Sequence, residues 1–268
     1  MTGPVRELLT MTAEPLDSPV TEALRTLEVR WIFPGQLAAE VTGWFARFPA
    51  TVESREDAYL LDPRLRGLSV KVRGDRALEV KVYLGSPGIL DLAGRARGRL
   101  QEWQKWSFPC GPLSRGSADS TGWQPVRKRR RISRFCPVNG PVVACVPGPC
   151  AEPHCEVELT DIVTPGQDWW TLGFEATGPA DLLRRELQAT AALVFANPLP
   201  VGVELSADKS SSYVEWLGQR SGAESDTDAL KPPAALIPCS ACEPQNREGA
   251  SCISCMASCI GSEGRMRS

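Results

Sequence analysis

The segment Leu68–Leu84, with the sequence LSVKVRGDRALEVKVYL, decides the fold. Two runs that alternate between apolar and ionisable residues flank a central Gly-Asp-Arg, and this pattern predicts a β-hairpin. A three-residue turn sets Lys71 opposite Glu79 and Arg73 opposite Ala77. One face of the hairpin then carries only ionisable side chains, which are Lys71, Arg73, Glu79 and Lys81. Because unpaired charges are costly to bury, this face must meet water, counter-ions or a charged ligand.

Length and charge exclude several classes of partner. The chain has 268 residues, which is enough for one sizeable core, and its formal net charge of −2 gives no whole-molecule attraction to nucleic acid or membrane. No apolar run reaches the ~18 residues of a membrane span, and residues 1–23 lack the basic and apolar blocks of a signal peptide. We therefore expect a cytoplasmic protein without a membrane partner, in which residues 1–23 form a flexible leader.

Alternating and helical patterns recur along the chain. Further strands are predicted over Leu27–Phe33, Arg55–Leu61, Val126–Phe135, Cys155–Ile162, Trp169–Ala176 and Val201–Leu205. Helical spacing predicts amphipathic helices over Gln36–Phe48 and Pro179–Phe195, and Ser210–Leu217 closes the ordered part. Residues 136–154 are rich in proline and lack periodicity, which predicts a loop insertion.

The predicted strands share a layout in which one face is apolar and the other carries bases and acids. Together the charged faces hold Glu28, Arg30, Lys71, Arg73, Glu79, Lys81, Lys128, Arg130, Glu156, Glu158 and Glu175. An antiparallel sheet with its polar side in water would show the same alternation. However, the amphipathic helices need an apolar surface to cover, and the charged faces contain few Ser, Thr or Gln residues. If the helices cover the apolar faces, the charged faces point inward and the sheet curves into a barrel.

A charged lumen of this kind predicts its own class of ligand. Phosphate oxygens match Arg and Lys side chains, and carboxylates can hold Mg²⁺ or Mn²⁺ that bridges phosphate oxygens.

The order and spacing of these pieces resemble the CYTH superfamily, the triphosphate tunnel metalloenzymes, over roughly residues 25–217. The matching positions are Asp57, Tyr59, Lys71, Arg73, Glu79, Lys81, Lys128, Arg130, Glu158, Glu175, Ser212, Tyr213 and Leu217. The resemblance implies an α+β fold over residues 24–217, with an eight-stranded antiparallel β-barrel (a tunnel) and helices packed on the outside. It also implies that a tri- or polyphosphate-containing ligand binds inside the tunnel together with Mg²⁺ or Mn²⁺.

The same resemblance assigns roles to individual residues. The phosphate-binding residues would be Lys71, Arg73, Lys81, Lys128 and Arg130. The metal ligands would be Glu28, Glu79, Glu158 and Glu175, and the catalytic pair would be Glu79 and Lys81.

The chain departs from the family's ExExK signature and from its paired acids. In LEVRWIF (27–33), Glu28 is kept, Arg30 stands at the second acidic position and Ile32 at the lysine position; shifting the register by two residues also loses one acid. Gly173 replaces the first acid of a later pair. Each lost carboxylate removes a metal ligand, and a base in its place repels the metal. Two hypotheses follow, which are a metal-dependent triphosphatase and a non-catalytic phosphate-binding or scaffold protein that has lost hydrolase activity.

The remaining motifs leave alternatives open. The tail, residues 218–268, is rich in Gly, Ser, Pro and acids, which predicts disorder. Its two CxxC pairs, Cys239, Cys242, Cys252 and Cys255, either hold a structural Zn²⁺ or have no ordered role. The basic run Arg127–Arg131 fits a nucleic-acid patch, but its strand-like flanks favour a lumen wall, so we predict no nucleic-acid partner.

Overall fold

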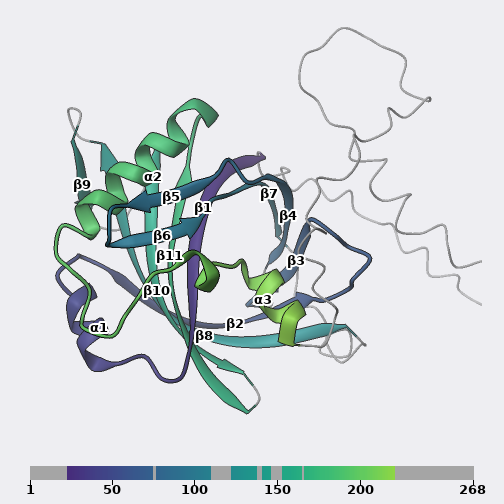
Figure 1. Ribbon diagram of the computed structural model, residues 1–268. Helices are drawn as coiled ribbons and strands as arrows, with labels where there is room; N and C mark the ends of the chain where they lie inside the picture. The colour runs from purple at the N-terminus through teal and green to yellow at the C-terminus, as the bar shows by residue number, and fades with distance from the viewer. Residues whose placement is uncertain are drawn as a thin grey trace, which may run out of the picture. The chain divides into compact units, whose positions relative to one another are not determined.

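The computed structural model describes residues 23–74, 77–109, 122–137, 141–145, 153–164 and 166–220 (Figure 1). The predicted leader, apart from residue 23, and the predicted tail, apart from residues 218–220, lie outside these described residues. The zinc prediction at Cys239, Cys242, Cys252 and Cys255 lies outside them as well.

The described part of the chain contains eleven strands and three α-helices. The strands are β1 (Leu24–Pro34), β2 (Thr51–Leu60), β3 (Leu68–Arg73), β4 (Ala77–Gly85), β5 (Ile89–Leu92), β6 (Ala96–Arg99), β7 (Gln101–Pro109), β8 (Trp123–Pro137), β9 (Val142–Cys145), β10 (His154–Thr164) and β11 (Gln167–Thr177). The helices are α1 (Ala39–Phe45), α2 (Ala180–Val194) and α3 (Tyr213–Arg220), with a 3₁₀ turn at Ala207–Lys209. No described helix is long and apolar enough to cross a membrane.

Eight of the strands close into an antiparallel barrel (Figure 1). Hydrogen-bonded neighbours follow the order β10-β11-β1-β7-β4-β3-β2-β8, and β10 pairs with β8 as well as with β11, which closes the ring. β9 pairs with the end of β8, and β5 and β6 form a separate two-stranded sheet. The predicted fold class, an α+β fold with an eight-stranded antiparallel β-barrel, is therefore confirmed.

The hairpin that opened the sequence argument has the predicted register. Lys71 lies opposite Glu79 and Arg73 lies opposite Ala77. Gly74 begins the turn with a φ of 53°, a left-handed conformation that glycine adopts without a steric penalty. Because the register is fixed, the ionisable side chains of both strands share one face.

Two helices cover the outer face of one side of the barrel. Helix α1 contributes Val41 and Phe45 to the core, and α2 contributes a stripe of apolar side chains at helical spacing. They pack against outward-facing residues of β1, β10 and β11, which include Val29, Trp31, Val157, Leu159, Leu172 and Phe174. Burying each large apolar side chain contributes about 1.5–3 kcal/mol, so this face stays under the helices and the opposite, charged face is left for the lumen.

Helix α3 packs differently, because it closes one end of the barrel. Trp216 and Leu217 form a second apolar cluster with four strand residues that face inward, which are Ile32, Tyr59, Val126 and Ile162. At its start, the Ser212 hydroxyl accepts from the Glu215 amide at 3.3 Å, and the Ser212 amide donates to the Glu215 carboxylate at 2.7 Å. This reciprocal capping box holds the helix over the end of the lumen.

Two segments differ from their sequence predictions. Val201–Leu205 is not a strand, and it begins in a turn at residues 201 and 202 in which Gly202 has a φ of 91°. Residues 136–154, predicted as a loop insertion, contain the end of β8 and strand β9.

Candidate functional site

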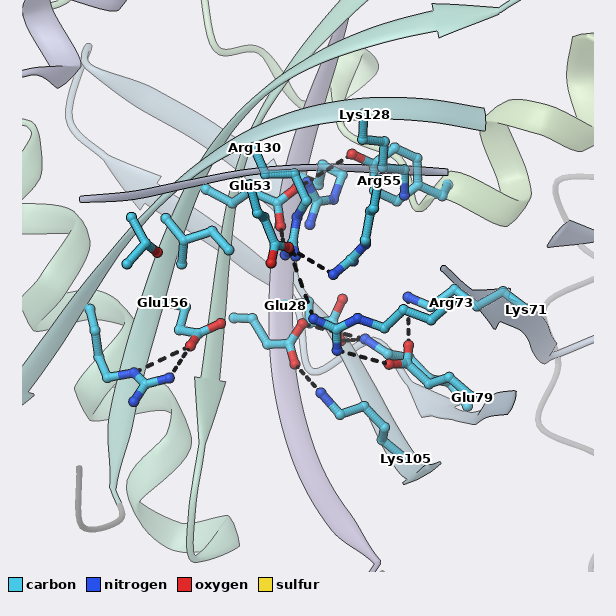
Figure 2. Close-up of a pocket in the computed structure, with 18 residues that line it drawn as sticks. Glu28, Glu53, Arg55, Lys71, Arg73, Glu79, Lys105, Lys128, Arg130 and Glu156 are labelled. Carbon is cyan, nitrogen blue, oxygen red and sulfur yellow. Dashed lines mark hydrogen bonds and ion pairs between the residues drawn. The ribbon is translucent and has the colours of Figure 1, made fainter. Parts of the chain in front are cut away.

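The barrel encloses a cavity of about 280 Å³ that is lined almost entirely by charged side chains (Figure 2). Nine basic residues line it, which are Arg30, Arg55, Lys71, Arg73, Lys81, Lys105, Lys128, Arg130 and Arg134. Six acidic residues line it, which are Glu28, Glu53, Glu79, Glu156, Glu158 and Glu175. An eight-stranded barrel has room inside for its own side chains and one small ligand.

Every residue that the sequence analysis proposed for the site lies in this lining. The five phosphate-binding candidates and the four metal-ligand candidates converge on the same cavity: Glu28, Lys71, Arg73, Glu79, Lys81, Lys128, Arg130, Glu158 and Glu175. They come from six strands, because inward positions recur at every second residue of a strand. The inward orientation of the hairpin's charged face is therefore a feature of the structure.

The sequence analysis missed four charged residues of the lining, which are Glu53, Arg55, Lys105 and Arg134. Strand β2 begins at Thr51, earlier than predicted, so Glu53 extends the inward series that continues to Asp57. Arg134 continues the alternation of Lys128 and Arg130 along β8, and that signal was available in the sequence.

One wall of the lumen is an arginine cluster, which we define as Arg30, Arg55, Arg73 and Arg130. Arg55 donates to the Glu53 carboxylate at 2.8 Å, Arg130 donates to the same carboxylate, and Arg73 lies 4.0 Å from it (Figure 2). Three guanidinium groups therefore surround a single carboxylate. Each of the three also lies close to a second carboxylate: Arg55 Nε lies 2.9 Å from Asp57, Arg73 lies 4.0 Å from Glu79, and Arg130 donates to Glu158. Guanidinium groups bind carboxylate and phosphate oxygens alike, through charge-assisted hydrogen bonds.

A second carboxylate links this cluster to the opposite strands. Glu158 accepts from Arg130 and from Arg30, the latter at 3.2 Å, and from the Thr160 hydroxyl at 2.6 Å. Burial alone would raise the pKa of Glu158, but the two arginines outweigh burial and hold it well below its usual range. Burial would lower the pKa of Arg130, and Glu158 instead raises it. Both groups are charged at neutral pH.

The other wall carries lysines, each paired with a carboxylate. Lys71 lies 2.6 Å from Glu79, and Lys81 lies 2.5 Å from Glu28. Glu175 is shared by two lysines, Lys105 at 2.8 Å and Lys81 at 3.4 Å. Burial would raise the pKa of Glu79 and of Glu175, but the neighbouring lysines hold both pKa values below the usual range.

Beneath helix α3, the closed end of the lumen holds the buried carboxylate of Asp57, which is paired with Lys128 and, at 2.9 Å, with Arg55. The Lys128 ammonium lies 3.0 Å from Asp57, and their side chains are 2% and 0% exposed. Lys128 also donates to the Tyr59 hydroxyl at 2.6 Å and lies 3.8 Å from the centre of the Tyr213 ring. Because its charge is satisfied on all these sides, Lys128 supports the end of the barrel more than it offers itself to a ligand.

The other end is more accessible and is net positive. Arg73 and Glu53 have side-chain exposures of 40% and 39%, the largest among the ion-paired groups of the lining. The nine basic and six acidic residues leave a formal excess of three positive charges, and counting Asp57 as well still leaves a positive lumen. The chain as a whole is at −2, so the lumen has the opposite sign to the molecule.

The carboxylates of the lumen do not fit a divalent metal. Glu28, Glu79, Glu158 and Glu175 are each paired with a lysine or an arginine, and the described residues contain no group of three or more His, Cys, Asp or Glu side chains that could hold a metal. Unit charges about 4 Å apart interact by about 4 kcal/mol at an effective dielectric constant near 20, so a fixed arginine opposes a divalent ion at that distance by about 8 kcal/mol.

Comparisons with known proteins find structural likeness among solved structures. No protein-family model matches the chain, and no curated protein matches it. Among solved structures, it is similar to the PH1819 protein from Pyrococcus horikoshii OT3, at 15% sequence identity and a TM-score of 0.41. The match covers 73% of this chain and 99% of that one, and a likeness of this strength assigns neither family nor function.

Proposed function

We propose that the barrel lumen binds a tri- or polyphosphate-containing ligand. The observation that carries this proposal is the arginine cluster, in which three guanidinium groups converge on the carboxylate of Glu53 inside a cavity lined by more basic than acidic residues. The resemblance to the CYTH superfamily in the order of the sequence motifs supports the same ligand class.

Phosphate fits this lumen better than a simple carboxylate does. Guanidinium groups bind phosphate oxygens through paired, charge-assisted hydrogen bonds, and a chain of phosphates carries enough negative charge to balance the excess in the lumen. Helix α3 closes one end with Trp216 and Leu217, so the ligand enters from the end where Arg73 is exposed. A small or linear ligand meets both requirements.

Isothermal titration calorimetry with inorganic triphosphate tests the proposal. Arg73 is the informative position, because it is half-exposed and lies 4.0 Å from both of its carboxylate neighbours, Glu53 and Glu79. We expect one binding site in the wild type and roughly tenfold weaker binding in Arg73→Gln, the loss of one charge-assisted hydrogen bond. The matched control is Arg127→Gln, because Arg127 lies on the same barrel but faces outward, paired with Glu56. Equal weakening in both variants, or no binding by the wild type, would contradict the proposal.

Hydrolysis of the bound phosphate remains a separate prediction. It assigns catalysis to Glu79 and Lys81 and requires Mg²⁺ or Mn²⁺ on Glu28, Glu79, Glu158 and Glu175. Release of phosphate from triphosphate or ATP with either metal, abolished in Glu79→Gln, would support the triphosphatase. Thermal stabilisation by triphosphate without phosphate release would support the non-catalytic binding protein, which the ion pairing of all four carboxylates favours.

The identity of the ligand is a matter for a thermal-shift panel. Inorganic triphosphate, longer polyphosphate, ATP and thiamine triphosphate share the same phosphate groups but differ in what lies at the mouth of the lumen. The ligand that raises the melting temperature most at equal concentration is the one whose non-phosphate part fits the mouth.

A further inference from the structure

Two departures from the paired-acid pattern occupy the same place in the lumen. Arg30 on β1 and Gly173 on β11 are directly opposed in the antiparallel register. A Cβ atom on residue 173 would lie 2.8 Å from the Arg30 Cζ and 2.9 Å from its Nη1. Real Cβ atoms do not approach other atoms so closely, so the guanidinium takes the space that a side chain at 173 would need. Gly173 is not in the left-handed region, so its missing side chain is the relevant feature.

The guanidinium of Arg30 is held by several neighbours, but only one of its nitrogen atoms donates hydrogen bonds to the described residues. Its Nη1 donates to Glu158 at 3.2 Å, to Thr171 at 3.2 Å and to the Tyr213 hydroxyl at 3.4 Å, and its Cζ lies 4.5 Å from the centre of the Tyr213 ring. Within the described residues, all of its hydrogen bonds leave from Nη1. Its Nε and Nη2 groups therefore retain N–H donors on a residue that lines the cavity.

The charge of Arg30 is permanent. Burial alone would lower its pKa, but Tyr213 and Glu158 outweigh burial and raise it. A fixed cation thus stands among the acidic residues of the lumen, in contact with Glu158. The Arg30 guanidinium repels a divalent ion and can itself donate hydrogen bonds to phosphate oxygens. It therefore supplies the positive charge that a metal ion would otherwise supply.

We infer that the guanidinium of Arg30, which lies against Gly173, takes the place of a divalent metal. The lumen then binds phosphate oxygens without Mg²⁺ or Mn²⁺. This inference rests on the proposed function and adds to it the metal independence of binding. It assigns Arg30 a ligand-binding role and Gly173 a positioning role.

The first test compares triphosphate binding by the wild type in EDTA with binding in MgCl₂ or MnCl₂, by isothermal titration calorimetry. We expect binding in EDTA, and equal or weaker binding with metal, because metal in solution competes for the triphosphate. Binding only in the presence of metal would overturn the inference and leave the proposed function standing. Absence of binding under both conditions would overturn both.

Substitutions at position 30 provide the second test. In EDTA, Arg30→Gln should bind triphosphate at least tenfold more weakly than the wild type, whereas the outward-facing Arg127→Gln should match it. Arg30→Glu restores an acid beside Glu28 and Glu158, and we expect it to bind Mn²⁺, measured by electron paramagnetic resonance, whereas the wild type does not. Tight Mn²⁺ binding by the wild type would overturn the inference. If Arg30→Glu does not fold, the Arg30→Gln titration and the wild-type Mn²⁺ measurement still decide the question.

The third test addresses the positioning role of Gly173. Gly173→Ala keeps every charge but places a methyl group where the guanidinium lies, so we expect it to weaken triphosphate binding several-fold. Gly43→Ala is the matched control, because Gly43 is exposed on α1 and a Cβ there meets nothing within 4 Å. Unchanged affinity in a folded Gly173→Ala would overturn the positioning role of Gly173.

Discussion

Gly173 lies directly opposite Arg30 across strands β1 and β11, and the Arg30 guanidinium fills the space that a side chain at position 173 would occupy. In the sequence these two positions are far apart and show no relation to each other. In the barrel they are neighbours across the sheet, and the guanidinium has room because residue 173 has no side chain. The lumen is consequently richer in fixed positive charge than in metal ligands.

The buried pair of Lys128 and Asp57 makes a prediction about stability. Asp57→Ala leaves the Lys128 ammonium, whose side chain is 2% exposed, without its carboxylate, so we expect the free energy of unfolding to fall by about 3–5 kcal/mol. Urea denaturation at neutral pH measures the change. The control is Glu56→Gln, which removes an exposed partner of Arg127 and should cost at most about 1 kcal/mol. Similar costs in the two variants would contradict the assignment of Lys128 as a support for the closed end.

The acidic residues of the lumen predict loss of stability in acid. The pKa values of Glu79, Glu158 and Glu175 are lower in the folded protein than usual, so the unfolded chain binds more protons. Their contribution to stability is complete above the unfolded glutamate pKa of about 4.3, and it is lost as the pH falls below that value toward the folded pKa.

Glu158→Gln tests this sign. The variant should be less stable than the wild type at pH 7, because Arg30 and Arg130 lose their shared carboxylate. It should also lose less stability than the wild type between pH 7 and pH 3, as measured by urea midpoints. If the wild type and the variant lost the same amount of stability between pH 7 and pH 3, the arginines would not be what keeps Glu158 ionised.

The closure of the lumen by helix α3 predicts that Trp216 contributes to the stability of the protein. Trp216 is buried against inward-facing strand residues, so Trp216→Ala should cost about 3–5 kcal/mol in unfolding free energy. Leu193→Ala, at a side chain of α2 that is 41% exposed, should change stability by no more than about 0.5 kcal/mol. A small effect of Trp216→Ala would mean that α3 does not hold the end of the barrel closed.

The electrostatic origin of binding predicts a dependence on salt. Triphosphate affinity should fall as NaCl increases, because the mouth of the lumen near Arg73 is exposed to solvent and screened by ions. Arg73→Gln should show a weaker dependence than the wild type. Affinity that does not change with salt would argue against attraction by the net charge of the lumen.

The side chains that share one face of each strand could be predicted from the sequence, because this depends only on the local alternation of apolar and ionisable residues. The period of two in Leu68–Leu84 set Lys71, Arg73, Glu79 and Lys81 on one face, and the structure confirms both the register and the inward orientation. The apolar stripe of α2 likewise predicted that a helix covers the outside.

Apart from the pair of Lys71 and Glu79, which the hairpin register places opposite each other, the ion pairs between distant strands could not be predicted, because they depend on how the ring closes. Arg30 and Glu158 are 128 residues apart in the chain, and they meet only because β11 lies between β1 and β10. Which of several acids receives which base is decided by this closure. The relation between Arg30 and Gly173 is hidden for the same reason.

Which elements lie at the two ends of the lumen could not be predicted from the sequence either. An amphipathic pattern around Trp216 indicates that α3 buries one face, but not that the face covers the inner side of the barrel. Glu53 was missed because the residues that precede Arg55 show no clear apolar alternation, although β2 begins at Thr51.

The most direct measurement is a crystal structure of the full chain grown with inorganic triphosphate in the presence of EDTA. The account predicts electron density for triphosphate inside the barrel, in contact with Arg30 and Arg73 and with no metal ion beside it. A lumen that contains only water at a saturating triphosphate concentration, or triphosphate bound only on the outer surface, would contradict it.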